Sequence, residues 1–143
     1  MRKTWDYRRN KGMEASGLSL QPGMGIKIMG DISPDAKCFR LNLGKDEHNL
    51  ALHFNPRFNA CDDTNTIICN SRQEGIWGTE QREANFPFLP GTTVEVSVTF
   101  EGSQFTVKLP DGSQISFPNR LNLETIDFFQ VNGDFTLKTL SFQ

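Results

Sequence analysis

The feature that most limits how this chain can fold is a repeated alternation of apolar and polar residues. Residues 94–100 read Val-Glu-Val-Ser-Val-Thr-Phe, and residues 39–43 and 105–109 repeat the pattern. Successive side chains of an extended chain point to opposite faces, so each run predicts a strand with one buried face. Turns containing Gly102 and Gly112 are predicted to close hairpins between such runs. Because no strand–helix–strand alternation occurs, we expect an antiparallel β-sandwich or barrel.

Three places depart from simple alternation. Residues 121–129 are the only helical candidate, with room for a single turn. Strict parity after Arg82 would place Phe86 and Phe88 on a polar face, so a bend or bulge is predicted near residues 83–85. In the C-terminal run, residues 135 and 137 are out of phase with residues 140 and 142. Either a bulge switches the faces there, or both faces are covered and one of them contacts another subunit.

The length and charge of the chain limit its organisation. At 143 residues the chain predicts one domain, which we place at residues 13–143. Residues 1–12 hold five basic residues against one acidic residue, so this segment carries +4 and the remainder −6 of a net −2. We expect residues 1–12 to be a basic, disordered extension. The balanced charge argues against a nucleic-acid partner.

Targeting signals are sparse. No apolar run approaches the roughly 20 residues that span a bilayer, so no membrane insertion is expected. The N-terminus is charged and lacks the apolar segment of a signal peptide. The chain has three cysteines, Cys38, Cys61 and Cys69, which is an odd number, and it has no Asn-x-Ser/Thr glycosylation site. These observations predict synthesis in the cytosol with reduced thiols.

A polar face between residues 53 and 82 is the strongest functional signal. On a strand, His53, Asn55 and Arg57 share one face, whereas residues 52, 54 and 58 give an apolar opposite face. Trp77 is followed by Glu80 and Arg82, which again share a face. An imidazole, an amide and a guanidinium beside an exposed indole suit a ligand that is apolar on one side and hydroxylated on the other. Carbohydrates have this character.

At this level of detail the chain resembles a known family. The segments His-Phe-Asn-Pro-Arg-Phe at 53–58, Cys-Asn-Ser at 69–71 and Trp-Gly-Thr-Glu-Gln-Arg-Glu at 77–83 are similar to the signature of the galectins. The flanking segments 41–44 and 117–124 are similar too, and the resemblance covers residues 16–143. It implies an all-β, jelly-roll-like sandwich of two antiparallel sheets, the galectin carbohydrate-recognition domain. It further implies metal-free binding of β-galactosides of the lactose or N-acetyllactosamine type.

The resemblance also implies a role for individual residues. By motif position, His53, Asn55 and Arg57 would hold the axial 4-hydroxyl of galactose. Asn70 and Glu80 would take the 6-hydroxyl, Trp77 would stack on the sugar, and Arg82 with Glu80 would reach the second sugar. Arg40, Asn42, Cys61 and Asp63 are candidates for a secondary subsite, where Arg40 and Cys61 depart from the pattern of close relatives.

The same resemblance implies partners and a location. Single-domain galectins commonly pair through their terminal strands, so we expect a homodimer that cross-links β-galactoside glycans on glycoproteins or glycolipids. Cytoplasmic and extracellular locations, reached without a signal peptide, are expected for the same reason. No cofactor is implied.

Three rival functions compete with this one. A glycosidase needs two facing carboxyl groups, and Glu80 with Asp63 is the only obvious pair, but arginines are expected to hold Glu80 ionised. Cys61 with His53 lacks an orienting third group, so no enzyme is predicted. His48, His53, Asp62 and Asp63 match no metal-site spacing. A galectin-fold protein that binds proteins and has weak or lost sugar binding is the main alternative.

Overall fold

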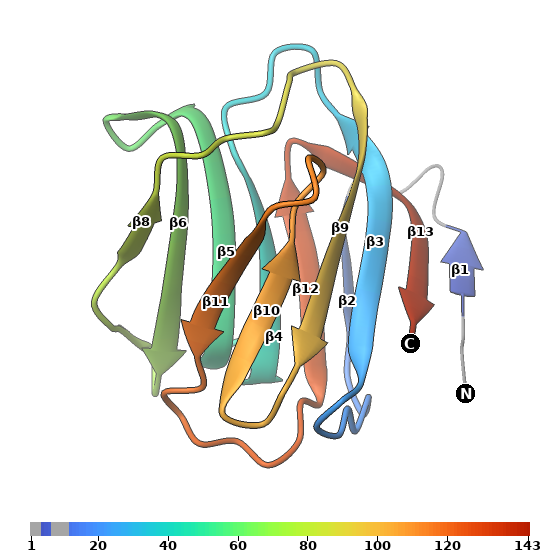
Figure 1. Ribbon diagram of the computed structural model, residues 1–143, viewed down its shortest axis with the longest axis vertical. Coiled ribbons are helices and arrows are strands. Elements are labelled where there is room, and N and C mark those ends of the chain that lie inside the picture. Colours follow the sequence, from blue (N-terminus) through green and yellow to red (C-terminus); the bar gives the residue numbers. More distant parts are fainter. Residues whose placement is uncertain (1–3, 7–11) are drawn as a thin grey trace.

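The computed structural model of the protein describes residues 4–6 and 12–143, and these residues form two antiparallel β-sheets (Figure 1). One sheet has the strand order β1-β13-β3-β9-β10-β11, and the other has the order β2-β12-β4-β5-β6-β7, with β8 also paired to β6. The strands are β1 (Thr4–Asp6), β2 (Met13–Ala15), β3 (Gly25–Ile32), β4 (Phe39–Asp46), β5 (Asn49–Ala60), β6 (Asp63–Gln73), β7 (Ile76–Trp77), β8 (Gln81–Glu83), β9 (Thr93–Phe100), β10 (Gln104–Lys108), β11 (Gln114–Pro118), β12 (Phe128–Gly133) and β13 (Phe135–Phe142). Of the two predicted architectures, the sandwich is the correct one.

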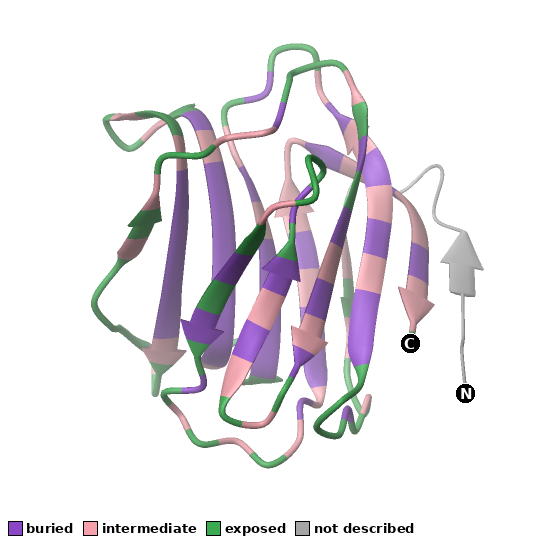
Figure 2. Cartoon of the chain, in the orientation of Figure 1, coloured by how far each residue is buried: buried purple, intermediate pink, exposed green. Residues whose placement is uncertain are grey.

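The core lies between the two sheets and is rich in phenylalanine. In β9 and β10 the buried and partly exposed residues alternate, as the bands along these strands in Figure 2 show. Phe39 of the seven-stranded sheet stacks on Phe135 of the other sheet with ring centroids 4.9 Å apart. The apolar half of each alternating run therefore faces the opposite sheet, as the pattern predicted.

Both predicted hairpins are confirmed. β9 pairs with β10, and β10 pairs with β11, in antiparallel register. The connecting turns place Gly102 at φ 83° and Gly112 at φ 85°. Glycine suits these positions because an L-residue with a Cβ rarely adopts positive φ.

The helix predicted at residues 121–129 is wrong. Turns and bends lead from residue 119 to residue 127, and β12 begins at Phe128. The Asn119 amide donates to the carbonyls of Gly102 and Leu123 and accepts from the Leu123 N–H. Asn122 also lies at φ 54°, outside the helical region. These local bonds stabilise a turn where a helix was expected.

The break predicted near residues 83–85 is confirmed. β8 ends at Glu83, and the chain then crosses to β9 in the other sheet. Phe86 packs against the core and Phe88 is buried within it during the crossing. Leaving the sheet removes the parity conflict, because these side chains no longer follow the alternation of β8.

The C-terminal phase change is a bulge. The register between β13 and β3 shifts between Leu137 and Thr139. Leu137 and Leu140 are therefore both buried, and Phe142 packs against the same core. One extra residue brings both apolar pairs to a single face, so the alternative of two covered faces is not needed.

The predicted basic extension falls largely outside the described residues. Within it, Thr4–Asp6 pair with β13 in the register Thr4 to Ser141 and Asp6 to Thr139. Among the described residues no helix is long and apolar enough to cross a membrane.

The turn between β5 and β6 offers a test of backbone strain. Ala60 pairs with Asp63, and the two residues between them, Cys61 and Asp62, lie at φ 51° and φ 64°. Such two-residue turns favour Gly at the second position because side chains disfavour positive φ. We expect Asp62→Gly to raise the free energy of unfolding by about 0.5 kcal/mol in denaturant titrations. Asp62→Ala should lower it, and a Gly variant less stable than the Ala variant would refute this explanation.

Candidate functional site

The predicted polar face lies on the outer surface of the seven-stranded sheet. Antiparallel register sets Asn42 opposite His53 on one side and Asn70 opposite His53 on the other. Ile68 pairs with both Asn55 and Arg82, which brings β8 beside the same face. Leu52, Phe54 and Phe58 point the other way and are buried in the core, as predicted.

This face is hollowed into an open groove of about 600 Å³. The groove crosses several strands, so residues distant in the chain line it together. Its lining includes every candidate residue except Asp63 and Arg82, which form ion pairs with the lining residues Arg57 and Glu80. The lining residues are Cys38, Arg40, Asn42, Glu47, Leu50, His53, Asn55, Arg57, Cys61, Ile68, Asn70, Arg72, Trp77, Gly78, Glu80, Gln130 and Asn132.

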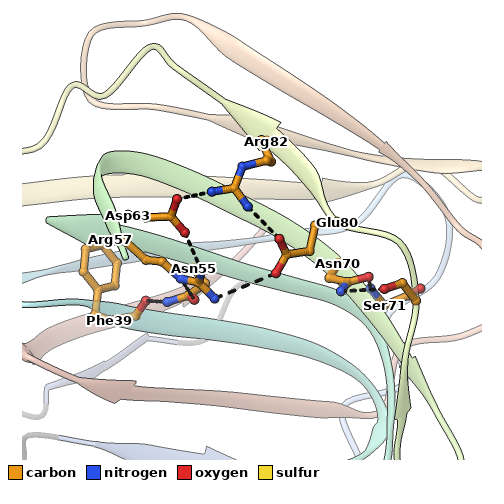
Figure 3. Close-up of polar contacts among 9 residues, drawn as sticks. Phe39, Asn55, Arg57, Asp63, Asn70, Ser71, Glu80 and Arg82 are labelled. Atoms are coloured by element: carbon orange, nitrogen blue, oxygen red, sulfur yellow. Dashed lines mark hydrogen bonds and ion pairs between the residues drawn. The ribbon is translucent and has the colours of Figure 1, made fainter. Parts of the chain in front are cut away.

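Arg57 is fixed in the groove by its neighbours (Figure 3). Its Nε donates to Asn55 Oδ1 at 2.9 Å, and its Nη1 donates to Asp63 Oδ2 at 2.7 Å. The NH₂ group of Asn55 donates to the Phe39 carbonyl at 2.8 Å. An amide oxygen and a carboxylate together hold the guanidinium plane, so its remaining N–H groups have a fixed direction.

Asp63 has a more central place than the sequence predicted. It was a candidate for the secondary subsite, whereas Glu80 was the residue expected to pair with arginines. In the structure Asp63 bridges Arg57 and Arg82, whereas Glu80 Oε2 is 4.0 Å from Arg57 Nη2. Glu80 Oε1 instead accepts from Arg82 Nη1 at 2.6 Å. The four charged side chains form one alternating network along the edge of the groove (Figure 3).

Asn70 is held by residues that the sequence did not single out. Its Nδ2 donates to the Gly78 carbonyl at 3.0 Å, and its Oδ1 accepts from the Ser71 N–H at 2.8 Å and from Arg120 Nη1 at 3.3 Å. The side-chain oxygen is thus occupied, and one hydrogen of Nδ2 is left for a ligand. Arg120 belongs to the segment 117–124 that resembles the galectins, which was the available signal.

Trp77 lies exposed at the rim of the groove, as predicted. Its side chain is 46% exposed, and its ring centroid is 4.5 Å from that of His53. The guanidinium of Arg72 lies over the same indole at 5.2 Å, a contact that the sequence did not predict. An exposed indole that packs against an imidazole and a guanidinium can offer its remaining free area to an apolar ligand face.

His53 is buried and uncharged. Its Nδ1 lies 2.7 Å from Asn42 Oδ1, and among the described residues its Nε2 has no hydrogen-bond partner. Burial, followed by the positive charges of three arginines, lowers the pKa of His53 from 6.5 to about 4. These arginines are Arg40, Arg57 and Arg72. At neutral pH the ring therefore carries one hydrogen, and one of its nitrogens is an acceptor.

Three of the four candidates for the secondary subsite line the groove, and the fourth, Asp63, belongs to the ion-pair network. Arg40 lines the groove and donates to Asn132 Oδ1 at 3.0 Å, while Asn42 is buried beside His53. Cys61 is exposed on the β5–β6 turn at one end of the groove. Cys69 faces the core, and burial raises the pKa of its thiol to about 12. Within the described ranges no three His, Cys, Asp or Glu side chains gather where they could hold a metal ion.

These observations define a sandwich domain with an oriented polar groove, and comparison with known proteins gives its family. A family profile described as "Galactoside-binding lectin" matches residues 14–142. This chain belongs to that family.

Named relatives cover nearly the whole chain. It is 54% identical to a galectin-1 of Bos taurus over 132 residues, which span 92% of this chain and 98% of the relative. A "Beta-galactoside-binding lectin" of Gallus gallus is 49% identical over 133 residues, spanning 93% and 98%. These relatives are lectins by name, in agreement with the prediction that the chain is not an enzyme.

Solved structures agree with the fold. A homodimeric agglutinin from chicken liver, CG-16, has a TM-score of 0.89 and 45% identity, covering 92% of this chain and 99% of that one. A toad ovary galectin in complex with thio-digalactose has a TM-score of 0.90 and 39% identity, covering 94% and 99%. The prediction of a galectin sandwich is confirmed.

Proposed function

We propose that this chain is a lectin that binds β-galactosides of the lactose or N-acetyllactosamine type, without a metal ion, in the groove between His53 and Arg82. The observation that carries the proposal is the oriented set of polar groups around Arg57. Its guanidinium is held by Asn55 and Asp63 and lies beside the buried, neutral His53. Family membership and the thio-digalactose complex of a relative support the same ligand class.

One sugar hydroxyl can satisfy this set completely. Arg57 can only donate, and the NH₂ group of Asn55 has one hydrogen left to donate, because the other goes to the Phe39 carbonyl. A hydroxyl oxygen accepting from these groups can give its own hydrogen to a ring nitrogen of His53. An axial hydroxyl, such as the 4-hydroxyl of galactose, is our choice for this position. An equatorial epimer would point elsewhere and leave the protein groups unpaired, which costs affinity.

The other candidate residues complete the proposed complex. Trp77 would stack on the C–H face of the same sugar, and Asn70 and Glu80 would meet its 6-hydroxyl. Arg82, held by Glu80 and Asp63, would reach the second sugar. Arg40, Asn42 and Cys61 would lie along a subsite for longer glycans, with Asp63 supporting both arginines of the network.

The proposal extends to assembly and location. We infer a homodimer that pairs through terminal strands and cross-links glycoproteins or glycolipids, as the homodimeric state of the chicken agglutinin suggests. Each shallow site should be weak, with a Kd on the order of 10 μM to 1 mM, so two sites would gain avidity on clustered glycans. We place the protein in the cytoplasm and outside the cell. Residues 13–143 would form the recognition domain and residues 1–12 an extension.

The test is retention on immobilised lactose with release by free lactose, followed by calorimetric titration. Trp77→Ala should weaken lactose binding roughly 10- to 100-fold, because the stacking surface is removed. Folding should be unaffected, since the side chain is half exposed.

Ile76→Ala is the matched control for Trp77→Ala. Ile76 is the neighbouring exposed apolar residue of β7 and points to the opposite face of the strand. The Ile76→Ala variant should bind lactose as the wild type does. If the wild type does not bind lactose, the result would favour a galectin-fold protein with another binding function.

A further inference from the structure

A chain of side-chain hydrogen bonds crosses four strands of the seven-stranded sheet and ends at His53. Gln130 Nε2 donates to Glu14 Oε1 at 3.0 Å, linking β12 to β2 at the sheet edge. Asn42 Nδ2 donates to Gln130 Oε1 at 2.9 Å, linking β4 to β12. Asn42 Oδ1 then lies 2.7 Å from His53 Nδ1 on β5. The strand register sets these residues side by side, Gln130 opposite both Glu14 and Asn42, and Asn42 opposite His53.

The direction of this chain follows from its first member. An ionised carboxylate accepts hydrogen bonds and cannot donate them, so Glu14 requires the NH₂ group of Gln130. The oxygen of Gln130 then faces Asn42 and requires its NH₂ group. The oxygen of Asn42 is left to face His53, and Nδ1 must carry the ring hydrogen.

The opposite direction would create an unfavourable contact. Turning both amides would set the oxygen of Gln130 against the carboxylate of Glu14, so two acceptors would meet without a hydrogen. The carboxylate of Glu14 at the edge of the sheet therefore determines which way the amide groups of Gln130 and Asn42 face.

We propose that Glu14, Gln130 and Asn42 act as positioning residues that fix His53 with its hydrogen on Nδ1 and the lone pair of Nε2 open to the groove. His53 is then an acceptor only and selects a hydroxyl that donates to it. This inference rests on the proposed function, because it assigns the direction of the hydrogen bond between His53 and the sugar. It adds Glu14 of β2 and Gln130 of β12 to the residues that determine the specificity of the site, and it gives Asn42 of β4 a positioning role.

The groups that face His53 are consistent with this role. Arg40 on β4, Arg57 on β5 and Arg72 on β6 are the charged neighbours, and Trp77 on β7 contacts the ring. All three charges are positive and disfavour a second hydrogen on the imidazole. Arginine offers no acceptor, so the acceptor for Nδ1–H comes from Asn42.

The test is a matched pair of substitutions at Gln130, in the middle of the chain of hydrogen bonds, and it is read by NMR on the ligand-free protein. Gln130→Lys supplies only donors, so Asn42 must turn its oxygen toward the lysine and its NH₂ group toward His53. The ring hydrogen should then move to Nε2. Gln130→Glu supplies only acceptors, so Asn42 should keep its direction and His53 its hydrogen on Nδ1.

The measurement is the long-range ¹H–¹⁵N correlation pattern of the imidazole, which distinguishes the two tautomers without any sugar. Glu14→Lys, at an exposed position, is a second reversing variant and should also move the hydrogen to Nε2. A folded lysine variant that keeps the hydrogen on Nδ1, or a wild type that carries it on Nε2, would overturn the proposal. Thermal unfolding verifies that each variant is folded.

Lactose titration separates this inference from the proposed function. In Gln130→Lys the His53 nitrogen that faces the hydroxyl would donate and could no longer accept its hydrogen, so affinity should fall about tenfold. If the tautomers switch as expected but the wild type does not bind lactose, the hydrogen-bond chain stands and the proposed function fails. If the wild type binds lactose and Gln130→Lys moves the hydrogen without any loss of affinity, the selection of a donating hydroxyl is wrong.

Discussion

Acidification from pH 6.5 to pH 4 should lower the free energy of unfolding by about 3 kcal/mol through His53 alone. The folded protein holds the pKa of this histidine at about 4, against 6.5 in the unfolded chain. Between these values the unfolded state binds a proton that the folded state does not, so stability falls as the pH falls. A difference of one pKa unit corresponds to about 1.36 kcal/mol, which gives the size of the effect.

Other groups act at lower pH and can be told apart. The pKa values of Asp46, Glu101 and Asp111 are lowered by hydrogen bonds to neighbouring side chains. Carboxylates of this kind contribute stability that is lost only as the pH falls below about 4.5, outside most of the window of His53. A titration between pH 7 and pH 4.5 therefore reports mainly on the histidine.

The measurement is urea unfolding at a series of pH values for the wild type and for His53→Gln. The glutamine can still donate to Asn42 but does not titrate, so its stability should change little in this window. His48→Gln is the matched control, because His48 lies exposed at the β4–β5 hairpin. It should keep the acid loss of the wild type. Equal acid sensitivity in the wild type and His53→Gln would contradict the assignment.

Local pattern was enough to predict the faces of the strands. The parity of residues 53, 55 and 57 is a property of one extended segment, and the structure places all three on the groove as expected. The same local argument located the break after Glu83, and it gave the bulge near residue 138 as one of two ways to resolve the change of phase. It failed at residues 121–129, where hydrogen bonds of the Asn119 side chain decide the backbone path.

Contacts between strands that lie far apart in the sequence could not be predicted from the local sequence pattern. Asp63 bridges Arg57 and Arg82 because the β5–β6 turn returns it beside β5 while β8 lies across β6. Gln130 meets Asn42 and Glu14 only through the register of β12 with β4 and β2. Register depends on the packing of the whole sheet, so these partners could not be read from spacing along the chain. The ligand class was nevertheless predictable, because His53, Asn55 and Arg57 share one strand, and Trp77 and Glu80 lie together in one short segment.

Truncation of Phe39 should destabilise the fold more than any substitution on its surface. The ring is fully buried between the two sheets. It stacks on Phe135 of β13 and meets the edge of Phe88, which lies on the segment that crosses between the sheets. Phe39→Ala would leave a cavity bordered by rigid rings that cannot collapse into it. We expect a loss of about 3–5 kcal/mol in the free energy of unfolding.

Graded controls distinguish a cavity effect from a general intolerance to substitution. Phe39→Leu retains most of the volume and should cost about 1–2 kcal/mol. Leu89→Ala removes an apolar side chain that is 68% exposed and should change stability by no more than about 0.5 kcal/mol. Urea unfolding of the three variants measures the series. If Phe39→Ala cost no more than Phe39→Leu, the surrounding rings would have to fill the space, and the core would be more deformable than its ring contacts imply.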